Sequence, residues 1–244
     1  MEPIYRAQFT VHSTDCDPYN RMKPSALLSI MQEVAGDHCK GTPVDWESLA
    51  ARNLFFAITR QHVQITRLPR QGEVITVETW PGITSRVAYP RSTVCYDSEG
   101  NELFRAMSLW VLMDMTTRSM VLPGKSGVEL TGSVRGNELA TPGSLAPKNY
   151  AANMRRQVMY SELDRNGHMN NCRYMDWMLD LLPSGFHASH PLTDFTVSYL
   201  SEAKEGQQVD LSYELTPEGI LSVEAQRPGD DKAHRVFAIR ANFA

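Results

Sequence analysis

The sequence contains no apolar run that approaches the roughly 18 residues needed for a membrane-crossing helix. It has four cysteines but no Cys-x-x-Cys pair, and a chain of 244 residues needs no disulfides to stabilise its core, so we expect reduced thiols. Its first residues show neither the apolar segment of a signal peptide nor the Arg- and Ser-rich composition of a transit peptide. These absences predict a cytoplasmic protein with no membrane span.

Several functional signatures are also missing. No Gly-x-Ser-x-Gly occurs, which argues against an α/β-hydrolase, and there is neither a P-loop nor a dinucleotide fingerprint. His187 and His190 lack an adjacent glutamate and a third ligand, so we expect no metal site. The net charge of −4 gives no footprint for nucleic acid. We therefore expect no cofactor, no metal and no nucleic-acid partner.

The most informative stretch is residues 161–174, where Asp164, Asn166 and His168 stand at alternate positions. Apolar residues follow at the spacing of one helical face, and this predicts a helix over residues 170–182. They are Tyr174, Trp177, Met178 and Leu181. The start of a helix offers unpaired N–H donors and a partial positive charge, which suit a developing oxyanion. The motif therefore indicates a candidate catalytic site.

Structural interpretations of the same residues remain open. Asn166-Gly167 is a strong turn signal, and His168 alone could be a packed histidine. Either Asn170 or Asn171 could cap the predicted helix. Cys172 could be a nucleophile, but a small packing residue is the favoured interpretation.

The first half begins with a predicted strand at residues 4–12 and a helix that opens at Pro24. The apolar stripe of that helix consists of Leu27, Ile30, Met31 and Val34. A short helix, with Thr42 as its cap, should run to residue 51. Four strands are then predicted, over residues 55–67, 74–80, 88–97 and 102–113.

Glycine and proline punctuate residues 123–149, which reads as a connection between two halves. The second half then repeats the order of the first. A strand at residues 154–160 and a helix precede four strands, predicted at residues 194–200, 209–215, 221–226 and 236–243. Each half would be a long apolar helix wrapped by an antiparallel sheet. The sequence thus predicts an α+β tandem, or double, hotdog fold, with domains at residues 1–122 and 150–244 and a linker at 123–149.

The two halves differ at the polar motif. Residues 17–22 parallel residues 164–169, and the stretch that begins at residue 68 parallels the one at residue 202. Tyr19, Arg21 and Leu68 stand where the second half has Asn166, His168 and Glu202. An ordinary turn would not need this asymmetry, so we expect an active site in the second half only.

Residues 163–174 resemble the Asp-x-Asn-x-His-x-Asn-Asn-x-x-Tyr signature of acyl-acyl-carrier-protein (acyl-ACP) thioesterases, of the plant plastid type and their bacterial relatives. Residues 57–80 and 110–118 are similar to further segments of that family, and the resemblance runs from about residue 5 to residue 242. It implies that the family's proposed catalytic residues fall on Asp164, Asn166, His168 and Glu202. Ala203 stands where plant members often have cysteine, which argues against a cysteine nucleophile, and a bacterial-type member is implied.

The resemblance implies an enzyme that hydrolyses fatty acyl-ACP to free fatty acid and ACP, which terminates fatty acid synthesis. Its partner would be acyl carrier protein with a phosphopantetheine-linked acyl chain. The alternatives are an acyl-CoA thioesterase of the same fold and a non-catalytic acyl-binding hotdog module. A homodimer is left open.

Two mechanisms fit the motif. Asp164 or Glu202 could deprotonate a water while His168 passes the proton to the leaving sulfur. In the rival mechanism Asp164 attacks directly and forms a mixed anhydride. The first half would then be free to hold the acyl tail, with Met31, Val34 and Trp80 as candidate lining residues.

Overall fold

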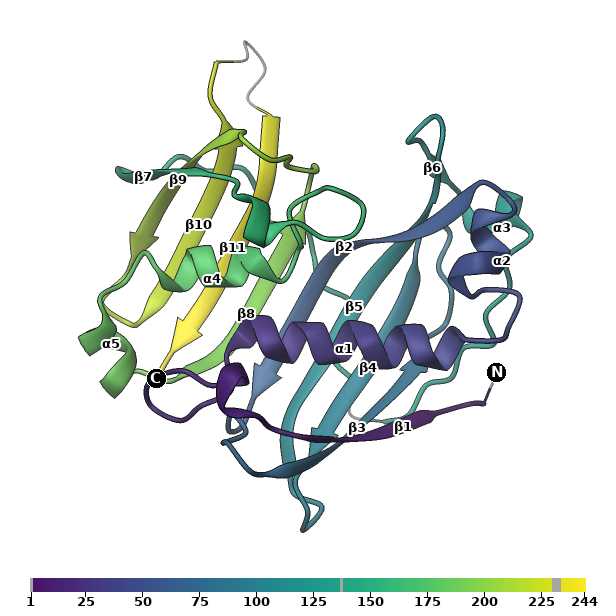
Figure 1. The fold of residues 1–244 in the computed structure, drawn as a ribbon, viewed down its shortest axis with the longest axis horizontal. Coiled ribbons are helices and arrows are strands. Elements are labelled where there is room, and N and C mark those ends of the chain that lie inside the picture. Colours follow the sequence, from purple (N-terminus) through teal and green to yellow (C-terminus); the bar gives the residue numbers. More distant parts are fainter. Residues whose placement is uncertain (1, 137, 230–233) are drawn as a thin grey trace. The chain divides into compact units, whose positions relative to one another are not determined.

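The computed structural model describes residues 2–136, 138–229 and 234–244. These residues form two compact units, Met1–Pro142 (unit 1) and Gly143–Ala244 (unit 2). Each unit is built from an antiparallel sheet with helices packed on it, as Figure 1 shows. The α+β class predicted from the sequence is confirmed.

The sheet of unit 1 has the strand order β1-β3-β4-β5-β2, with β6 beside β5, and all pairs are antiparallel. The strands are β1 (Tyr5–Thr10), β2 (Leu54–Ile65), β3 (Val74–Pro81), β4 (Tyr89–Tyr96), β5 (Glu102–Asp114) and β6 (Met120–Val121). Each predicted strand of the first half overlaps an observed one. The sequence did not predict β6, because two residues are too few to show alternation.

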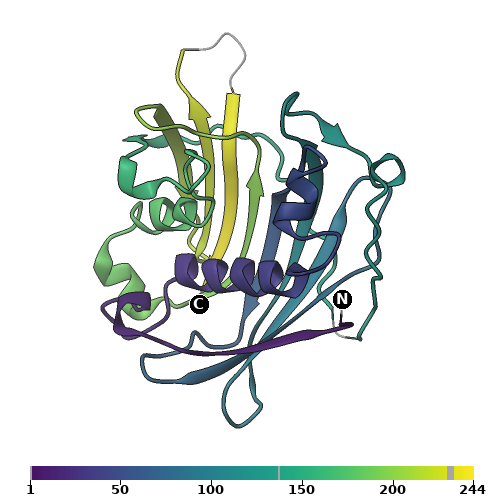
Figure 2. The same cartoon turned by 45° about the vertical axis from the view of Figure 1, so that its right-hand side comes forward.

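Helix α1 (Pro24–Cys39) begins at the proline that the sequence placed in its first turn. It runs across the strands of unit 1, as Figures 1 and 2 show. Leu27, Met31 and Val34 from the predicted stripe are buried. Burial of such side chains stabilises the unit by about 1.5–3 kcal/mol each. The helix therefore supplies much of the apolar core of unit 1.

Helix α2 (Trp46–Ala50) starts later than predicted. Asp45 caps it, because its Oδ1 accepts the N–H of Ser48 at 2.8 Å. The prediction that Thr42 caps this helix is wrong: the Thr42 hydroxyl donates to the carbonyl of Cys39 at 2.6 Å and so closes the end of α1. Thr42 and Asp45 are both residues that commonly cap helices, and in the structure the Asp45 carboxylate is the one that caps α2.

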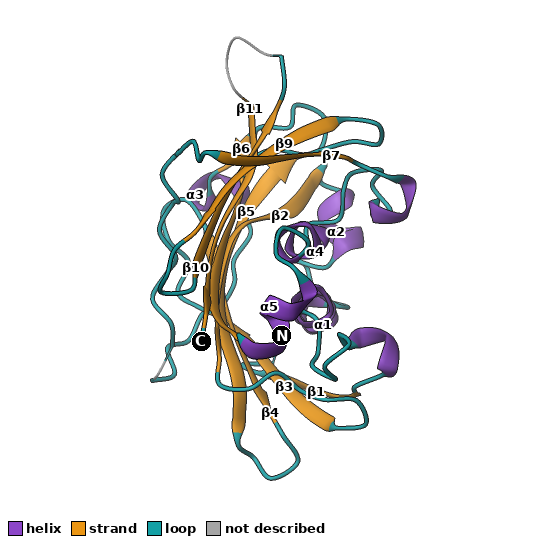
Figure 3. Cartoon of the chain, turned by 90° about the vertical axis from the view of Figure 1, so that its left-hand side faces the viewer, coloured by secondary structure: helices purple, strands orange, loops and turns teal. Residues whose placement is uncertain are grey.

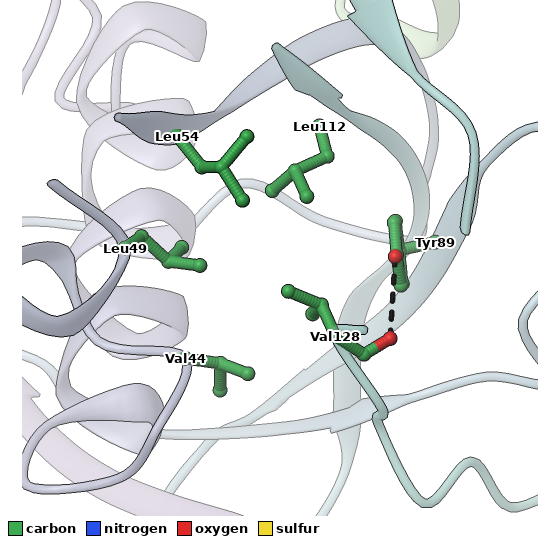
Figure 4. Packing of buried hydrophobic residues seen from close by; sticks show 6 residues of the cluster. All are labelled: Val44, Leu49, Leu54, Tyr89, Leu112 and Val128. Atoms are coloured by element: carbon green, nitrogen blue, oxygen red, sulfur yellow. Dashed lines mark hydrogen bonds between the residues drawn. The ribbon is translucent and has the colours of Figure 1, made fainter. Parts of the chain in front are cut away.

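Residues 123–142, predicted to be part of a linker, pack on unit 1 and include the short helix α3 (Pro123–Ser126). Figure 4 shows Val128 in a buried cluster, and the Tyr89 hydroxyl donates to the Val128 carbonyl at 3.3 Å. The other members of the cluster are Val44, Leu49, Leu54 and Leu112. A few apolar residues thus anchor a segment whose composition is that of a loop.

The sheet of unit 2 has the order β8-β11-β10-β9-β7, again antiparallel. The strands are β7 (Ala152–Gln157), β8 (Leu192–Tyr199), β9 (Gln208–Leu215), β10 (Ile220–Arg227) and β11 (His234–Phe243). Helices α4 (Arg173–Leu179) and α5 (Ser184–Ser189) lie on one side of these strands (Figure 3). The ring of Tyr174 in α4 stacks on Phe237 of β11 with centroids 4.4 Å apart. Helix α4 is therefore held against the sheet by its apolar face.

Helix α4 is shorter than the predicted helix over residues 170–182. The N–H of Leu181 bonds to the carbonyl of Met178, and that of Leu182 bonds to Leu179, so the chain tightens into single turns before Pro183. A proline disfavours the helical conformation of the residue before it. The predicted helix thus exists, but only its central part keeps α-helical hydrogen bonds.

Candidate active site

The polar motif forms a closed loop between Glu162 and Asn170. The Asn170 N–H bonds to the Glu162 carbonyl at 2.8 Å, and the Asp164 N–H bonds to the His168 carbonyl at 2.8 Å. Gly167 sits at the tip with a φ of +76°, a conformation that glycine adopts at little cost. The turn signal and the polar motif therefore describe the same structure, a narrow loop that presents three polar side chains.

Asp164 holds this loop together. Its Oδ1 accepts the backbone N–H of Asn166 at 2.8 Å and that of His168 at 3.3 Å. Its Oδ2 accepts the Nδ2 of the Asn166 amide at 3.3 Å. The carboxylate therefore orients the Asn166 side chain and stiffens the backbone that carries His168.

The structure brings His168 together with Glu202, which is distant in sequence. Their Nε2 and Oε2 atoms lie 3.3 Å apart. The Met169 N–H bonds to the Ala203 carbonyl at 2.8 Å, and this places the two segments side by side. The side chains are 20% and 47% exposed, respectively, so water and substrate can reach them. This pair is suited to moving a proton.

Two tyrosines lie near the loop, the buried Tyr174 and the half-buried Tyr199, with ring centres 6.1 Å apart. Burial raises the pKa of Tyr174, and the nearby negative charge of Asp164 raises it further. Burial also raises the pKa of Tyr199. Both hydroxyls therefore stay neutral at physiological pH and add no charge beside the loop.

The structure also shows what Asn170 and Cys172 do at the end of the loop. Asn170 Oδ1 accepts the Cys172 N–H at 2.9 Å, so Asn170 caps the turn before α4 rather than α4 itself. Cys172 is only 2% exposed. Its burial supports a packing role over that of a nucleophile.

Glu162 lies at the base of the loop and was not among the predicted site residues. Its Oε1 accepts the Nε1–H of Trp177 at 2.6 Å, and its Oε2 accepts the Met159 N–H at 2.9 Å. An acid three residues after a helix cap was the one local signal. The partner Trp177 could not be inferred, because the bond joins two elements.

In unit 1, Trp80 does not share a face of the sheet with α1. Its neighbour Thr79 points toward α1, since the Thr79 hydroxyl accepts from Arg91 Nη1 at 3.2 Å and the same nitrogen lies 3.1 Å from His38 Nδ1. Adjacent strand residues face opposite sides. Trp80 instead donates to Glu138 Oε1 at 2.6 Å and lines a cavity of about 310 Å³. The structure therefore does not bring it together with the other two candidate lining residues.

Met31 and Val34 do lie on the buried side of α1, near a polar cluster at the end of that helix. His38 Nε2 lies 2.7 Å from the Glu2 carbonyl, so Nε2 carries the hydrogen and Nδ1 accepts from Arg91. Burial lowers the pKa of His38, and the positive charge of Arg91 lowers it further. The apolar surface under α1 thus ends at a buried cation that the sequence did not reveal.

Within the described ranges, no three His, Cys, Asp or Glu side chains gather closely enough to hold a metal ion. His187, one of the two histidines considered as ligands, has its Nε2 3.0 Å from the Leu179 carbonyl. Among the helices of the described residues, none is long and apolar enough to cross a membrane.

Two family models match the chain: the acyl-ACP thioesterase N-terminal domain over residues 2–122 and the acyl-ACP thioesterase C-terminal domain over residues 146–238. A similar protein, the chloroplastic dodecanoyl-[acyl-carrier-protein] hydrolase of Cinnamomum camphora, is 25% identical over 228 residues, which are 82% of this chain and 56% of that protein. The chain spans about half the length of the curated relatives it matches.

Two solved structures are similar along almost the whole chain. The acyl-ACP thioesterase from Bacteroides thetaiotaomicron VPI-5482 has a TM-score of 0.86 at 23% identity, with 99% of this chain and 98% of that chain covered. The 12:0-ACP thioesterase from Umbellularia californica has a TM-score of 0.81 at 22% identity, with 100% and 98% covered. These similarities show the double hotdog fold. Because the two domain models together match most of its length, the chain belongs to the acyl-ACP thioesterase family.

Proposed function

We propose that the protein hydrolyses fatty acyl-ACP to a free fatty acid and ACP. The observation that carries this proposal is the His168–Glu202 pair, whose Nε2 and Oε2 atoms lie 3.3 Å apart in the unit that matches the family's C-terminal domain. Relatives named as acyl-ACP hydrolases support the carrier protein as partner. In this proposal unit 2 performs the chemistry and unit 1 holds the acyl tail.

A thioester demands little from the leaving group, because a thiol has a pKa of about 8.5. The harder tasks are to aim a nucleophile and to stabilise the oxyanion. In the proposed route the His168–Glu202 pair takes a proton from a water that attacks the carbonyl carbon. The C–S bond of the tetrahedral intermediate then breaks, and His168 delivers the proton to the leaving sulfur. Asn166, whose amide is held by Asp164, orients the water.

The rival route, in which Asp164 attacks the thioester, is less well supported by the geometry. Three N–H groups already donate to the Asp164 carboxylate, and they stabilise its charge and weaken it as a nucleophile. Asp164→Asn separates the routes, because asparagine keeps an oxygen for the two backbone N–H groups but cannot form an anhydride. Turnover within about tenfold of wild type would support water attack, and complete loss in a folded variant would support Asp164 attack.

The function is tested by steady-state hydrolysis of acyl-ACP and acyl-CoA with the same acyl chain. We expect a higher kcat/KM for acyl-ACP. A clear preference for acyl-CoA would support the second enzyme class. Acyl binding without hydrolysis of either substrate would show a binding module and overturn the proposal.

A further inference from the structure

We propose that the hydrogen bond between Glu162 and Trp177 positions the catalytic loop, and that both are positioning residues for the thioesterase reaction. The proposal rests on the proposed function. Neither side chain contacts His168 or Glu202 in any described interaction, so both would act through the loop backbone. The inference comes from three observations: the place of Glu162 at the base of the loop, the short length of α4, and the absence of this bond in unit 1.

Glu162 joins three segments at the base of the loop. Its carboxylate accepts from the indole of Trp177 at 2.6 Å and from the backbone of Met159 at 2.9 Å. Its carbonyl accepts the N–H of Asn170 at 2.8 Å, which closes the loop. Any movement of Glu162 is therefore passed to both ends of the segment that carries His168.

Helix α4, on which Trp177 lies, is too short to be a stable platform by itself. It has seven residues, and isolated helices shorter than about 12–15 residues are marginal in water. Trp177 is 1% exposed, and the guanidinium carbon of Arg156 lies 5.3 Å from the centre of its ring. A hydrogen bond to a charged acceptor is roughly twice as strong as a neutral one. The Glu162–Trp177 bond therefore ties the loop to the buried face of α4.

Unit 1 lacks this bond although its loop is built in the same way. Asp15 stands in the place of Glu162: its Oδ2 accepts the His12 N–H at 3.0 Å and its carbonyl accepts the Lys23 N–H at 2.8 Å. The residue 15 positions after Glu162 is Trp177, whereas the residue 15 positions after Asp15 is Ile30, which has no polar atom in its side chain. No described side chain of α1 donates to Asp15.

The added bond is therefore found in the loop with the candidate catalytic residues and is absent from its structural counterpart. If it only stabilised the fold, unit 1 would need an equivalent as much as unit 2 does. A shift of about 1 Å in the position of a catalytic group can lower the rate by up to about a hundredfold. We therefore expect its loss to lower kcat more than it raises KM.

The test compares Trp177→Phe, Glu162→Gln and Glu162→Ala with the control Asp15→Ala, all in the full chain. Trp177→Phe keeps an aromatic ring but removes the donor, and we expect kcat for acyl-ACP to fall about tenfold with KM within twofold. Glu162→Ala should show a similar loss. Glu162→Gln keeps one oxygen that can still accept the Trp177 Nε1–H, but its NH2 group cannot accept the Met159 N–H, so it should recover only part of the loss. Asp15→Ala should leave kcat within twofold.

Hydrogen exchange of the backbone amides at residues 163–170 gives a readout independent of turnover. In Trp177→Phe these amides should exchange faster, and in Asp15→Ala they should not. A wild type that hydrolyses neither acyl-ACP nor acyl-CoA would overturn the proposed function, while the exchange data would still test the positioning role. Unchanged exchange and kcat within twofold in folded Trp177→Phe, or an equal loss of kcat in Asp15→Ala, would overturn the inference.

Discussion

The loop at residues 11–23 of unit 1 and the loop at residues 158–170 of unit 2 share one set of backbone hydrogen bonds. Asp17 bonds to Arg21 as Asp164 bonds to His168, N–H to carbonyl, each at 2.8 Å. Each loop is also joined to a second segment, by Met22 to Pro69 at 2.7 Å and by Met169 to Ala203 at 2.8 Å. The backbone framework is therefore common to the two halves and does not distinguish the half that carries the candidate site.

The side chains separate the two loops. In unit 1, Arg21 Nε donates to Asp17 Oδ2 at 3.0 Å, so the charge is balanced within the loop. Leu68, 9% exposed, stands in the place of Glu202. In unit 2, His168 reaches out to Glu202 instead. A protonatable pair has thus been placed on a framework that in unit 1 carries a closed ion pair.

The largest expected effect concerns this difference. His168→Ala should lower kcat for acyl-ACP at least about a hundredfold, since it removes the group that we propose moves the proton. Arg21→Ala, its counterpart, should leave kcat within about threefold. Steady-state kinetics and a melting curve for both proteins provide the measurement. Equal losses in two folded variants would erase the distinction between the loops.

The second prediction concerns the buried surface of α1 in unit 1. Each buried methylene contributes about 0.8 kcal/mol, so moving a wall by two carbons shifts chain-length preference by roughly tenfold. Met31→Trp should therefore shift the released acids toward shorter chains while His168 and its loop remain intact. Gas chromatography of products from C8 to C18 substrates measures the profile. Unchanged profiles for Met31→Trp and Val34→Phe would place the acyl tail outside unit 1.

The third prediction compares basic residues of the two units as contacts for the acidic carrier protein. Five arginines are candidates for such contacts: Arg86, Arg91, Arg118, Arg155 and Arg156. Arg91 is 6% exposed and is too buried to serve. Arg155 is exposed and pairs with Asp210, with Nε and Oδ1 2.6 Å apart, so Arg155→Glu replaces a balanced pair by two negative charges in the unit that carries the candidate site. It should lower kcat/KM for acyl-ACP about threefold, more than Arg86→Glu in unit 1, because exposed charges steer association.

The effect of Arg155→Glu should shrink as salt rises from about 0.05 to 0.3 M, the range in which screening becomes strong. The same variants assayed with acyl-CoA serve as the control, and their kcat/KM for acyl-CoA should stay near the wild-type value. A salt-independent kcat/KM for acyl-ACP in the wild type would contradict electrostatic steering.

The smallest effect concerns His38, the buried histidine of unit 1. Its pKa is lowered in the folded protein, so the unfolded chain binds a proton first as the pH falls below about 6.5. The free energy of unfolding should therefore decrease as the pH falls from about 7.5 to 5.5. His38→Gln, which keeps a donor for the Glu2 carbonyl, should lose less over this range. Urea unfolding at the two pH values measures the difference, and an identical decline in both proteins would assign it to other groups.

Much of the fold was predictable because the residues that decide it are close in sequence. Pro24 sets the start of α1 through its own backbone geometry. Alternation of apolar residues identified the strands of both sheets. The internal repeat placed Glu202 beside the loop of His168, because Leu68 and Pro69 hold the equivalent position in unit 1. Local pattern and repetition therefore located the candidate site.

The sequence by itself determined the elements, their repetition and the polar residues of the loop. Only the tertiary structure decided which face of β3 carries Trp80, that Asp45 rather than Thr42 caps α2, and that Val128 anchors residues 123–142. The Glu162–Trp177 bond likewise required the fold. Each of these features depends on a competition between partners or on contacts between separate elements, and such contacts leave no periodic signal along the chain.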